Sequence, residues 1–356
     1  MMKKQRMTKR EITQVVSCAV LGISVALMAI IPTGFVVQRP GPTVDVIDEI
    51  AEIPAIAISG AESYDPDGEL RLTTVQVQGG EGFPTWAFDI LSGYFRSDSS
   101  VTPVENVFPR DVPRQEIVER NRQEMEASQR RAIVVALESL GYEIPTILRV
   151  VGTVPDSGSD GVLEDGDILL GLNGEEVANF AELDAQLATI PGGDTVSVDI
   201  QRDGDDTSVD VVTMASEDGA AQLGVLLDPD FELPVDIEIN AQEIGGPSAG
   251  LIFSLGIVDL LTPGSLTGGE EIAGTGTIDL AGVVGPIGGI QQKLFGARED
   301  GAKWFLAPTN NCHDFSTVPD GLTVIPVDTF ESAKLAVEAI AAGQGASLPT
   351  CESVPE

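Results

Sequence analysis

The first clear hydrophobic pattern in the chain is an uncharged run over residues 12–38, which follows a short basic segment. As an α-helix this run would be about 40 Å long, more than the roughly 30 Å hydrocarbon core of a membrane. It predicts a transmembrane helix over residues 11–38, ended by Pro40 and Pro42. The basic residues before it predict a cytoplasmic tail over residues 1–10, a single-pass anchor in the cell membrane and an extracytoplasmic body.

Two other interpretations of the apolar run stay open. A cleaved signal peptide would be shorter and would end in a small-residue A-x-A site, which is not evident here. A lipoprotein would carry its lipidated cysteine after the apolar run, whereas Cys18, in Val15-Val16-Ser17-Cys18, comes near the beginning of it. We therefore expect a retained membrane anchor.

Alternating apolar and polar positions predict strands at residues 55–58 and 69–77. Residues 115–140 have the spacing of a helix. The stretch 39–135 is interpreted as a small β-rich segment plus this helix, and it contains no recognisable catalytic residues.

The rest of the chain changes character twice. Residues 136–215 show short strand patterns and one amphipathic helix near residues 180–188. Residues 222–345 combine strand and helix patterns, and residues 346–356 form a loose tail. The pattern as a whole is that of an α+β protein with several domains.

The charge balance limits the possible partners. The net charge is −36, from 56 acidic against 20 basic residues. Such a surface repels nucleic acid and anionic lipid. No Gly-Lys dipeptide occurs, so the sequence has no Walker A loop for ATP. We expect activity without ATP, a cofactor or a metal.

Two of the three cysteines, Cys312 and Cys351, lie in the acidic body. Cysteines of a domain outside the cytoplasm can pair. We predict a disulfide between them that ties down the C-terminal tail. Two free, half-buried thiols are the alternative.

Ser248 follows Gly245-Gly246-Pro247 and precedes an apolar helix pattern over residues 249–261. Free N–H groups and the positive end of the helix dipole favour negative charge at such a position. Ser248 is therefore a candidate nucleophile, with the backbone N–H groups of Gly246 and Ala249 as candidate oxyanion donors. A plain helix N-cap is the alternative.

Lys293 lies at the start of a second helix pattern, after Gly288-Gly289-Ile290. A lysine acts as a base only if its pKa falls from about 10.4 to about 7–8, and a helix N-terminus and burial both lower it. The alternative is a solvated surface lysine. A Ser-His-Asp triad would have to use His313, the only histidine, which lies in a polar, loop-like stretch. A Ser-Lys pair needs no histidine.

The stretch Gly246-Pro247-Ser248-Ala249-Gly250 is similar to the nucleophile motif of Lon-type serine proteases, which use a Ser-Lys dyad. The stretches 275–278 and 282–290, followed by Lys293, are similar to the strand and lysine segment of that family. The resemblance covers about residues 223–340. It implies that Ser248 is the nucleophile and Lys293 the base, and that Thr275 supplies a hydroxyl beside the lysine.

Two positions depart from the Lon pattern. Ile244-Gly245 stand where the family usually has Lys-Asp, and Thr277 stands where it has Glu. Substrate contacts or regulation near the nucleophile are therefore expected to differ. The resemblance also implies assembly into a homo-oligomer, as a hexameric ring.

The segment 136–215 resembles a PDZ domain of the kind found with bacterial proteases, through Leu163, Gly166, Asp167, Ile168, Asn173, Gly174 and Val177. PDZ domains bind an extended peptide as an added strand. The resemblance implies a polypeptide partner, with a carboxylate loop near Leu140, Gly141, Tyr142 and Glu143 and a second groove wall at residues 180–187. A PDZ fold used only as a spacer or lid is the alternative.

The order of anchor, β-rich segment, PDZ domain and Lon-type domain resembles the membrane-anchored PDZ-and-Lon-like proteins of bacterial envelopes. The resemblance implies an ATP-independent, membrane-anchored serine endopeptidase whose PDZ domain recruits or gates envelope polypeptides. Two alternatives stay open. One is a catalytically silent scaffold or peptide receptor, to which Gly245 and Thr277 point. The other is a protease that cleaves only itself.

Overall fold

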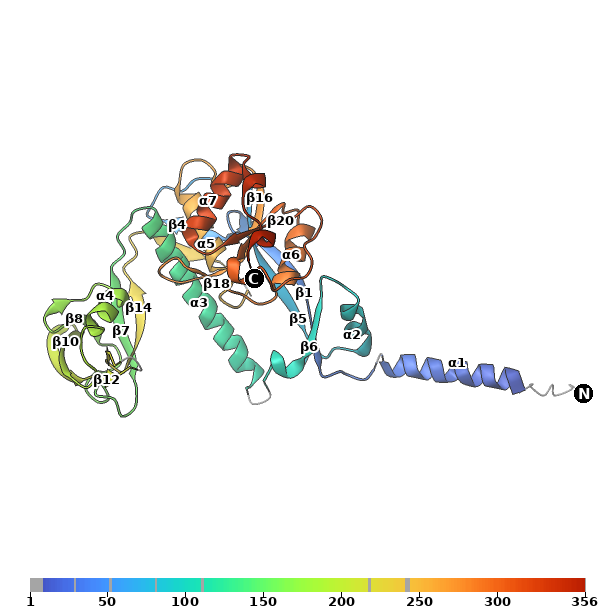
Figure 1. Cartoon of the computed structure of the whole chain (residues 1–356), viewed down its shortest axis with the longest axis horizontal. Coiled ribbons are helices and arrows are strands. Elements are labelled where there is room, and N and C mark those ends of the chain that lie inside the picture. Colours follow the sequence, from blue (N-terminus) through green and yellow to red (C-terminus); the bar gives the residue numbers. More distant parts are fainter. Residues whose placement is uncertain are drawn as a thin grey trace, which may run out of the picture. The chain divides into compact units, whose positions relative to one another are not determined.

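The computed structural model in Figure 1 describes residues 9–28, 30–50, 53–80, 82–109, 112–216, 219–240 and 244–355. Most of the predicted tail 1–10 lies outside these ranges. The chain divides into two compact units. Unit 1 combines Met1–Ala136 with Ile237–Glu356, and unit 2 is the intervening stretch Leu137–Asp236.

Helix α1 (Lys9–Met28) covers only part of the predicted transmembrane helix. Residues 35–38 instead begin strand β1 (Phe35–Asp45), so the predicted helix end at residue 38 is wrong. Pro32 explains the difference, since proline lacks an N–H and disfavours helix at the residue before it. None of the helices in the described ranges combines the length and the apolar character needed to cross a membrane.

Unit 1 is built on a six-stranded sheet with the order β20-β19-β16-β5-β1-β6. Its strands, in chain order, are β1, β5 (Glu69–Gln78), β6 (Ser100–Pro103), β16 (Glu271–Gly274), β19 (Trp304–Pro308) and β20 (Thr323–Val327). The predicted β-rich segment is therefore not a separate unit. Its strand β5 pairs in parallel with β16, for example Leu70 with Ile272, in the middle of the sheet.

The prolines that were expected to end the first helix lie inside β1. The pairing of β1 with β5 shifts register between Pro40 and Thr43, and such a bulge tolerates residues that cannot complete the ladder. Gly41 is required at this point, because an added Cβ would lie 2.3 Å from the Thr74 hydroxyl oxygen.

Helices cover this sheet. Helix α5 (Gly250–Leu261) is buried over most of its length, as its apolar pattern predicts. The other helices of unit 1 are α2 (Ala87–Tyr94), α3 (Arg114–Ser139, which ends in unit 2), α6 (Ile290–Glu299) and α7 (Phe330–Ala341). Short strands complete it: β2 (Glu49–Ile50), β3 (Ile53–Pro54), β4 (Ile56–Ser59), β17 (Thr277–Ile278) and β18 (Val284–Gly285), with β15 (Asp236–Ile239) at the boundary between the units.

Unit 2 is built on a sheet with the order β11-β10-β8-β7-β14, which packs around an apolar core. Its elements are β7 (Thr146–Thr153), β8 (Ile168–Leu172), β9 (Glu175–Glu176), α4 (Phe180–Leu187), β10 (Thr195–Arg202), β11 (Asp205–Val212), β12 (Met214–Ala215), β13 (Ala221–Gln222) and β14 (Val225–Phe231). Strand β14 pairs along the whole of β7. The unit therefore extends past the predicted boundary at residue 215, and residues 222–231 pack in unit 2 and not in unit 1.

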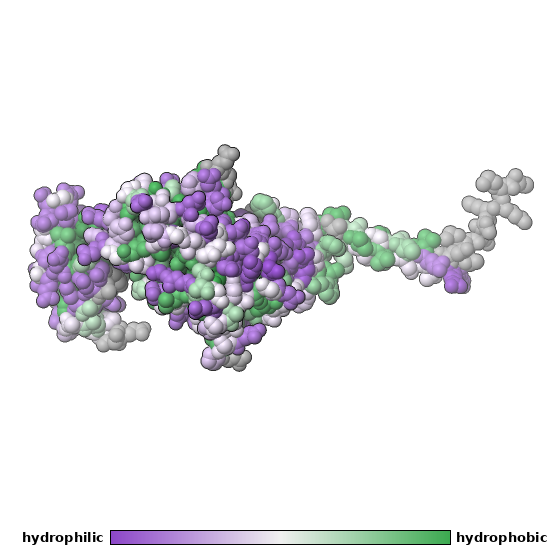
Figure 2. Space-filling view, turned by 90° about the horizontal axis from the view of Figure 1, so that it is seen from above, coloured by the Kyte–Doolittle hydropathy of each residue, from purple (hydrophilic) through white to green (hydrophobic). Residues whose placement is uncertain are grey.

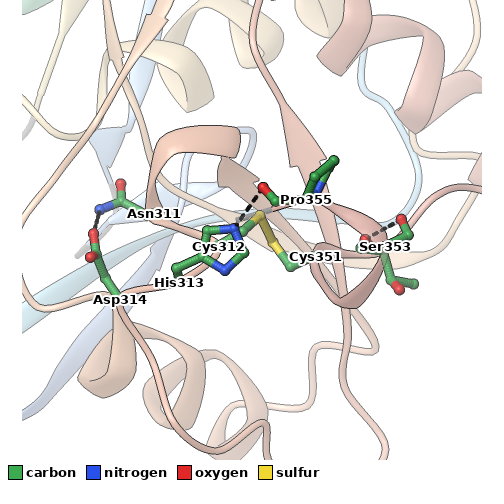
Figure 3. Close-up of a disulfide and its surroundings, with 8 residues drawn as sticks. Asn311, Cys312, His313, Asp314, Cys351, Ser353 and Pro355 are labelled. Atoms are coloured by element: carbon green, nitrogen blue, oxygen red, sulfur yellow. Dashed lines mark hydrogen bonds between the residues drawn. A yellow bond between two sulfur atoms is a disulfide. The ribbon is translucent and has the colours of Figure 1, made fainter.

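The predicted disulfide between Cys312 and Cys351 is present (Figure 3). His313, drawn beside it, contacts the Pro355 carbonyl oxygen at 3.2 Å. Asn311, next to the disulfide, accepts a hydrogen bond from the Ile287 N–H and donates one to the Ile287 carbonyl. The bridge thus joins the tail to the segment whose Asn311 holds the loop that leads into α6.

Candidate active site

Ser248 lies in the short loop that leads into α5, and its side chain is half-buried. Its carbonyl oxygen accepts hydrogen bonds from the Gly276 N–H at 2.8 Å and from the Thr275 hydroxyl at 2.9 Å. The preceding carbonyl, of Pro247, accepts a hydrogen bond from the Ser128 hydroxyl at 2.9 Å. The loop is held from two sides, which fixes the position of the Ser248 side chain.

Lys293 lies in the first turn of α6 and is only 3% exposed. Its amine is 2.8 Å from Ser248 Oγ and 2.8 Å from Thr275 Oγ1. Burial lowers the pKa of Lys293 to about 7, since the charged form loses its hydration. The neutral amine is therefore well populated at neutral pH.

Thr275 decides how the lysine amine is oriented. A hydroxyl carries one hydrogen, and the Thr275 hydrogen goes to the Ser248 carbonyl. The Thr275 oxygen can then only accept from Lys293. When Lys293 is neutral, one of its two N–H groups can donate to Thr275 while its lone pair accepts the hydrogen of Ser248 Oγ.

A cleft of about 770 Å³ opens beside Ser248 and Lys293. One wall comes from the loop at Ile244 and Gly245, and the other from β1 and β5. The wall residues on these two strands are Pro42, Val44, Thr73, Thr74, Val75 and Gln76. No part of the site was predicted in this segment, because an alternating pattern predicts a strand but does not indicate which strand it pairs with.

Within the part of the chain that the structure describes, strand β5 has an open edge at the cleft. Its partner β16 pairs with it only over Glu69–Leu72, and then turns away to place Thr275 at the lysine. On the side that β16 leaves, residues 73–76 face the cleft. An open strand edge offers backbone N–H and C=O groups to an extended peptide.

One predicted oxyanion donor is engaged elsewhere. The Gly246 N–H donates a hydrogen bond to the Asn121 carbonyl of α3 at 3.0 Å, which contradicts its assignment as a free donor. The N–H groups of Ser248 and Ala249 make no hydrogen bond to another described residue. Ala249 is the N-cap of α5, so the positive end of that helix dipole strengthens the attraction between its N–H and a negative charge.

The carboxylate loop predicted for unit 2 is misplaced. The N–H groups of Leu140 and Tyr142 donate to the Leu137 carbonyl, and that of Gly141 donates to Glu138. These bonds close the C-terminus of α3, so none of the three groups is free for a ligand. Glu143 follows in the same connection to β7.

Strand β7, which follows that connection, is flanked by β8 and β14, and β8 pairs with it only at Leu148 and Arg149. The outer strands of this sheet are β11 and β14. Just before β14, the carbonyls of Leu223 and Gly224 accept hydrogen bonds from the Ser159 and Ser157 hydroxyls and the Val154 N–H. The N–H groups of Leu223 and Gly224 bond to no other described residue. Among the described residues, two free backbone donors of unit 2 therefore lie at the start of β14.

Neither His313 nor a metal site contributes to the cleft of Ser248 in the described residues. His313 lies by the disulfide and the tail and is not among the residues that line the cleft of Ser248 (Figure 3). Among the described residues, no three His, Cys, Asp or Glu side chains are placed to hold a metal.

Comparison with known proteins agrees with this architecture. Residues 228–337 match the Lon protease (S16) C-terminal proteolytic domain, and residues 125–213 match the PDZ domain family. A Lon proteolytic domain and a PDZ domain are thus present in one chain.

Three curated relatives illustrate the match. Lon protease 1 of Herpetosiphon aurantiacus is 33% identical over 36% of this chain, Lon protease of Azospirillum brasilense 38% over 28%, and Lon protease of Escherichia coli strain K12 36% over 32%. The chain spans only 13% to 16% of the length of these relatives. They support the assignment of a serine peptidase domain.

Among solved structures, the PDZ domain of the SdrC-like protein from Listeria monocytogenes is similar, with a TM-score of 0.21 and 20% identity. The match covers 22% of this chain and 85% of that one. The PDZ domain of the SdrC-like protein from Listeria innocua matches with a TM-score of 0.22, 20% identity and coverages of 23% and 92%.

Proposed function

We propose that the protein is a serine endopeptidase that uses Ser248 as nucleophile and Lys293 as general base. The observation that carries the proposal is the 2.8 Å contact between the Lys293 amine and Ser248 Oγ inside a buried site. A lysine whose pKa is about 7 can accept the hydroxyl proton at neutral pH, whereas an ordinary lysine cannot.

In the proposed reaction, Ser248 Oγ bonds to the peptide carbonyl carbon while its proton passes to the Lys293 amine. The carbonyl oxygen becomes an oxyanion beside the free N–H of Ala249. The lysine ammonium then gives its proton to the leaving nitrogen as the C–N bond breaks, which leaves an acyl ester on Ser248. Water repeats the sequence: Lys293 takes its proton, its oxygen attacks the ester, and the proton returns to Ser248 Oγ.

An extended polypeptide fits the cleft best. A substrate strand placed on the open edge of β5 would lie along residues 73–76 beside Ser248. Main-chain pairing recognises no particular side chain, which suits an enzyme that cleaves many polypeptides. The reaction needs no ATP, because every group it uses is supplied by the cleft.

The other proposed features rest on separate observations. A peptide chain end would bind unit 2 at the start of β14, where the Leu223 and Gly224 N–H groups are free. Attachment to a cell membrane through α1 is supported by its exposed apolar side chains, such as Leu21 and Ile23. The disulfide supports an extracytoplasmic body. Recruitment or gating of envelope polypeptides and assembly into a homo-oligomeric ring stay predictions.

The test uses the full chain as wild type, Ser248→Ala and Lys293→Ala. Each is incubated with an unfolded protein without ATP, and fragments are identified by mass spectrometry. Cleavage by the wild type alone is the expected result, because removal of such a nucleophile typically costs about a million-fold in turnover. Equal cleavage by all three would refute the site.

A catalytically silent peptide receptor is the second candidate, since the Gly246 N–H is occupied by the Asn121 carbonyl. It predicts that all three proteins are inert with or without a unit 2 ligand. In that case a labelled unfolded chain would bind equally to the wild type and to Ser248→Ala.

A further inference from the structure

Helix α2 and its flanks carry an unusual group of exposed aromatic side chains. Five aromatic residues fall within residues 83–95, in a chain whose aromatic content is 5%. Phe88 is 73% exposed, Tyr94 79% and Phe95 83%. Phe83 and Leu91 are also exposed, and these five residues are called the aromatic patch below. Exposed apolar residues that gather in this way mark an interaction surface.

The fold holds the aromatic patch outward. On the inner face of α2, a Cβ on Gly93 would lie 2.9 Å from Val101 of β6 and 3.2 Å from Val37 of β1, so the helix sits directly on the sheet. Asp89 pairs with Arg39 of β1 at 3.6 Å. Phe88, Leu91 and Phe95 follow one another at helical spacing on a different face. The apolar face of α2 therefore points away from the protein core.

The aromatic patch is joined directly to the end of α1. Thr33 donates its N–H to the Thr85 carbonyl at 2.8 Å, and the two threonine hydroxyls lie 2.7 Å apart. Pro32 forms an isolated bridge with Trp86. Figure 2 shows apolar residues along α1 up to the point where it meets the body. The aromatic patch thus begins where α1 ends.

The distribution of apolar residues on α1 indicates what covers both this helix and the aromatic patch. Its exposed apolar residues lie at successive positions around the helix and include Val15, Val16, Val20, Leu21, Ile23, Val25, Leu27 and Met28. A protein partner covers one stripe of a helix, whereas lipid covers it all round. Tyrosine and phenylalanine are typical of the zone where a protein meets a membrane surface.

We propose that the aromatic patch lies on the lipid surface and forms a second membrane contact of the body. The proposal rests on the membrane attachment through α1 proposed above. It has a consequence for the substrate. The chain runs from the junction at Thr33 through strand β1 to Pro42 in the cleft wall, and an extended chain rises about 3.3 Å per residue. The cleft then lies within about 30 Å of the membrane surface, within reach of segments close to the membrane.

The chain has two tryptophans, and they make a matched pair of reporters. Trp86 adjoins the aromatic patch, whereas Trp304 lies in β19 of the sheet. The full chain is placed in phosphatidylcholine vesicles with acyl chains brominated near the headgroup, as Trp304→Phe and as Trp86→Phe. Bromine quenches tryptophan only at close range. We expect a loss of Trp86 emission and none of Trp304 emission, at low and high salt alike.

The second arm adds Phe88→Ser and Phe95→Ser to the Trp304→Phe chain. We expect Trp86 quenching to disappear while the protein still floats with the vesicles through α1. Leu335→Ser, at an exposed leucine of α7, is the control and should retain the quenching. Circular dichroism of each variant distinguishes loss of contact from loss of fold.

The outcomes distinguish the lipid contact of the aromatic patch from the membrane attachment through α1. Vesicle-bound protein with unquenched Trp86 overturns the lipid contact alone. A second copy of the chain would then be the occupant if the double variant also lowers the assembled mass in light scattering. Protein that does not float with vesicles at all overturns the attachment through α1 and the aromatic-patch contact with it. Neither outcome affects the cleavage assay on Ser248 and Lys293.

Discussion

The amine of Lys293 lies 2.8 Å from Thr275 Oγ1, and Thr275 gives its only hydrogen to the carbonyl of Ser248. The threonine therefore acts as a fixed acceptor for the lysine. It holds the loop that carries the nucleophile and orients the base with the same hydroxyl. It was expected from family resemblance only as a hydroxyl near the lysine.

Replacing Thr275 by valine should slow catalysis with little change in substrate binding. Valine keeps the shape but leaves the Lys293 N–H and the Ser248 carbonyl each one partner short. We expect kcat to fall by about 10- to 100-fold at nearly constant KM, a part of what a well-placed general base contributes. Thr323→Val, in β20, is the matched control and should retain full activity.

The pH profile should follow the protonation of Lys293. Only the neutral amine can accept a proton, and its pKa is about 7. We expect kcat/KM for a short peptide to rise as the pH increases from 5 to 8, with a midpoint at about 7. A profile that is flat over this range, or one whose midpoint shifts in a variant of His313, would contradict Lys293 as the base.

The same lysine should lower the stability of the fold in acid. Its pKa of about 7 in the folded state lies below the ordinary lysine value of 10.5, so between these values the unfolded chain binds more protons. The free energy of unfolding therefore increases with pH across that window, and the cost of the buried charge is complete below pH 7.

Lys293→Met removes this cost together with the activity. We expect the free energy of unfolding of the variant to exceed that of the wild type by about 2–4 kcal/mol at pH 6. This difference should shrink toward pH 9. Urea unfolding of both proteins at several pH values measures it. A constant difference over the whole range would show that Lys293 does not titrate in the folded state.

Local sequence patterns anticipated the central stretch well. A serine after Gly-Gly-Pro and a lysine after Gly-Gly-Ile each indicated a helix start, and the structure has α5 and α6 there. The spatial contact between Ser248 and Lys293 was expected only through family resemblance, because helix spacing says nothing about which two helices face each other.

The errors have a common physical origin in long-range pairing. Residues 69–77 were correctly predicted as a strand, but their neighbour is β16, some 200 residues later, and residues 73–76 form cleft wall because β16 ends its pairing at Leu72. Likewise Leu140 and Gly141 were predicted to lie in a ligand-binding loop. Their N–H groups instead donate hydrogen bonds to carbonyls in the last turn of α3. Hydrogen-bond partners decide both cases, and a local pattern does not contain them.

Gly224→Ala should weaken peptide binding by unit 2. Gly224 has a φ of +70°, and an added Cβ would lie 2.6 Å from the Cβ of Ser157, whose hydroxyl holds the Gly224 carbonyl. We expect the affinity for a peptide with a free C-terminus to fall about tenfold or more, equivalent to roughly 1.4 kcal/mol. Fluorescence polarisation with the full chain measures it.

Gly161→Ala is the control for that variant. Gly161 has a φ of +73°, but an added Cβ would meet no atom within 4 Å. Both variants thus carry the strain of alanine at positive φ, about 1 kcal/mol, and only Gly224→Ala disturbs the start of β14. Equal affinities of the two variants would place the peptide site elsewhere.

Removal of the disulfide should destabilise unit 1 without altering the chemistry of the site. Cys312 and Cys351 are 39 residues apart, and closing a loop of that length in the unfolded chain is worth about 4 kcal/mol. We expect Cys312→Ala/Cys351→Ala to lose about this much free energy of unfolding in urea, and the wild type to lose a similar amount when a reductant is present.

Folded protein of either kind should retain kcat, because the lysine segment is still held by Asn311 through both backbone groups of Ile287. Asn311→Ala separates the two effects: with the bridge intact, it should lower kcat by releasing the loop before α6. If the disulfide variant lost kcat while it remained folded, the bridge itself would be needed to position Lys293.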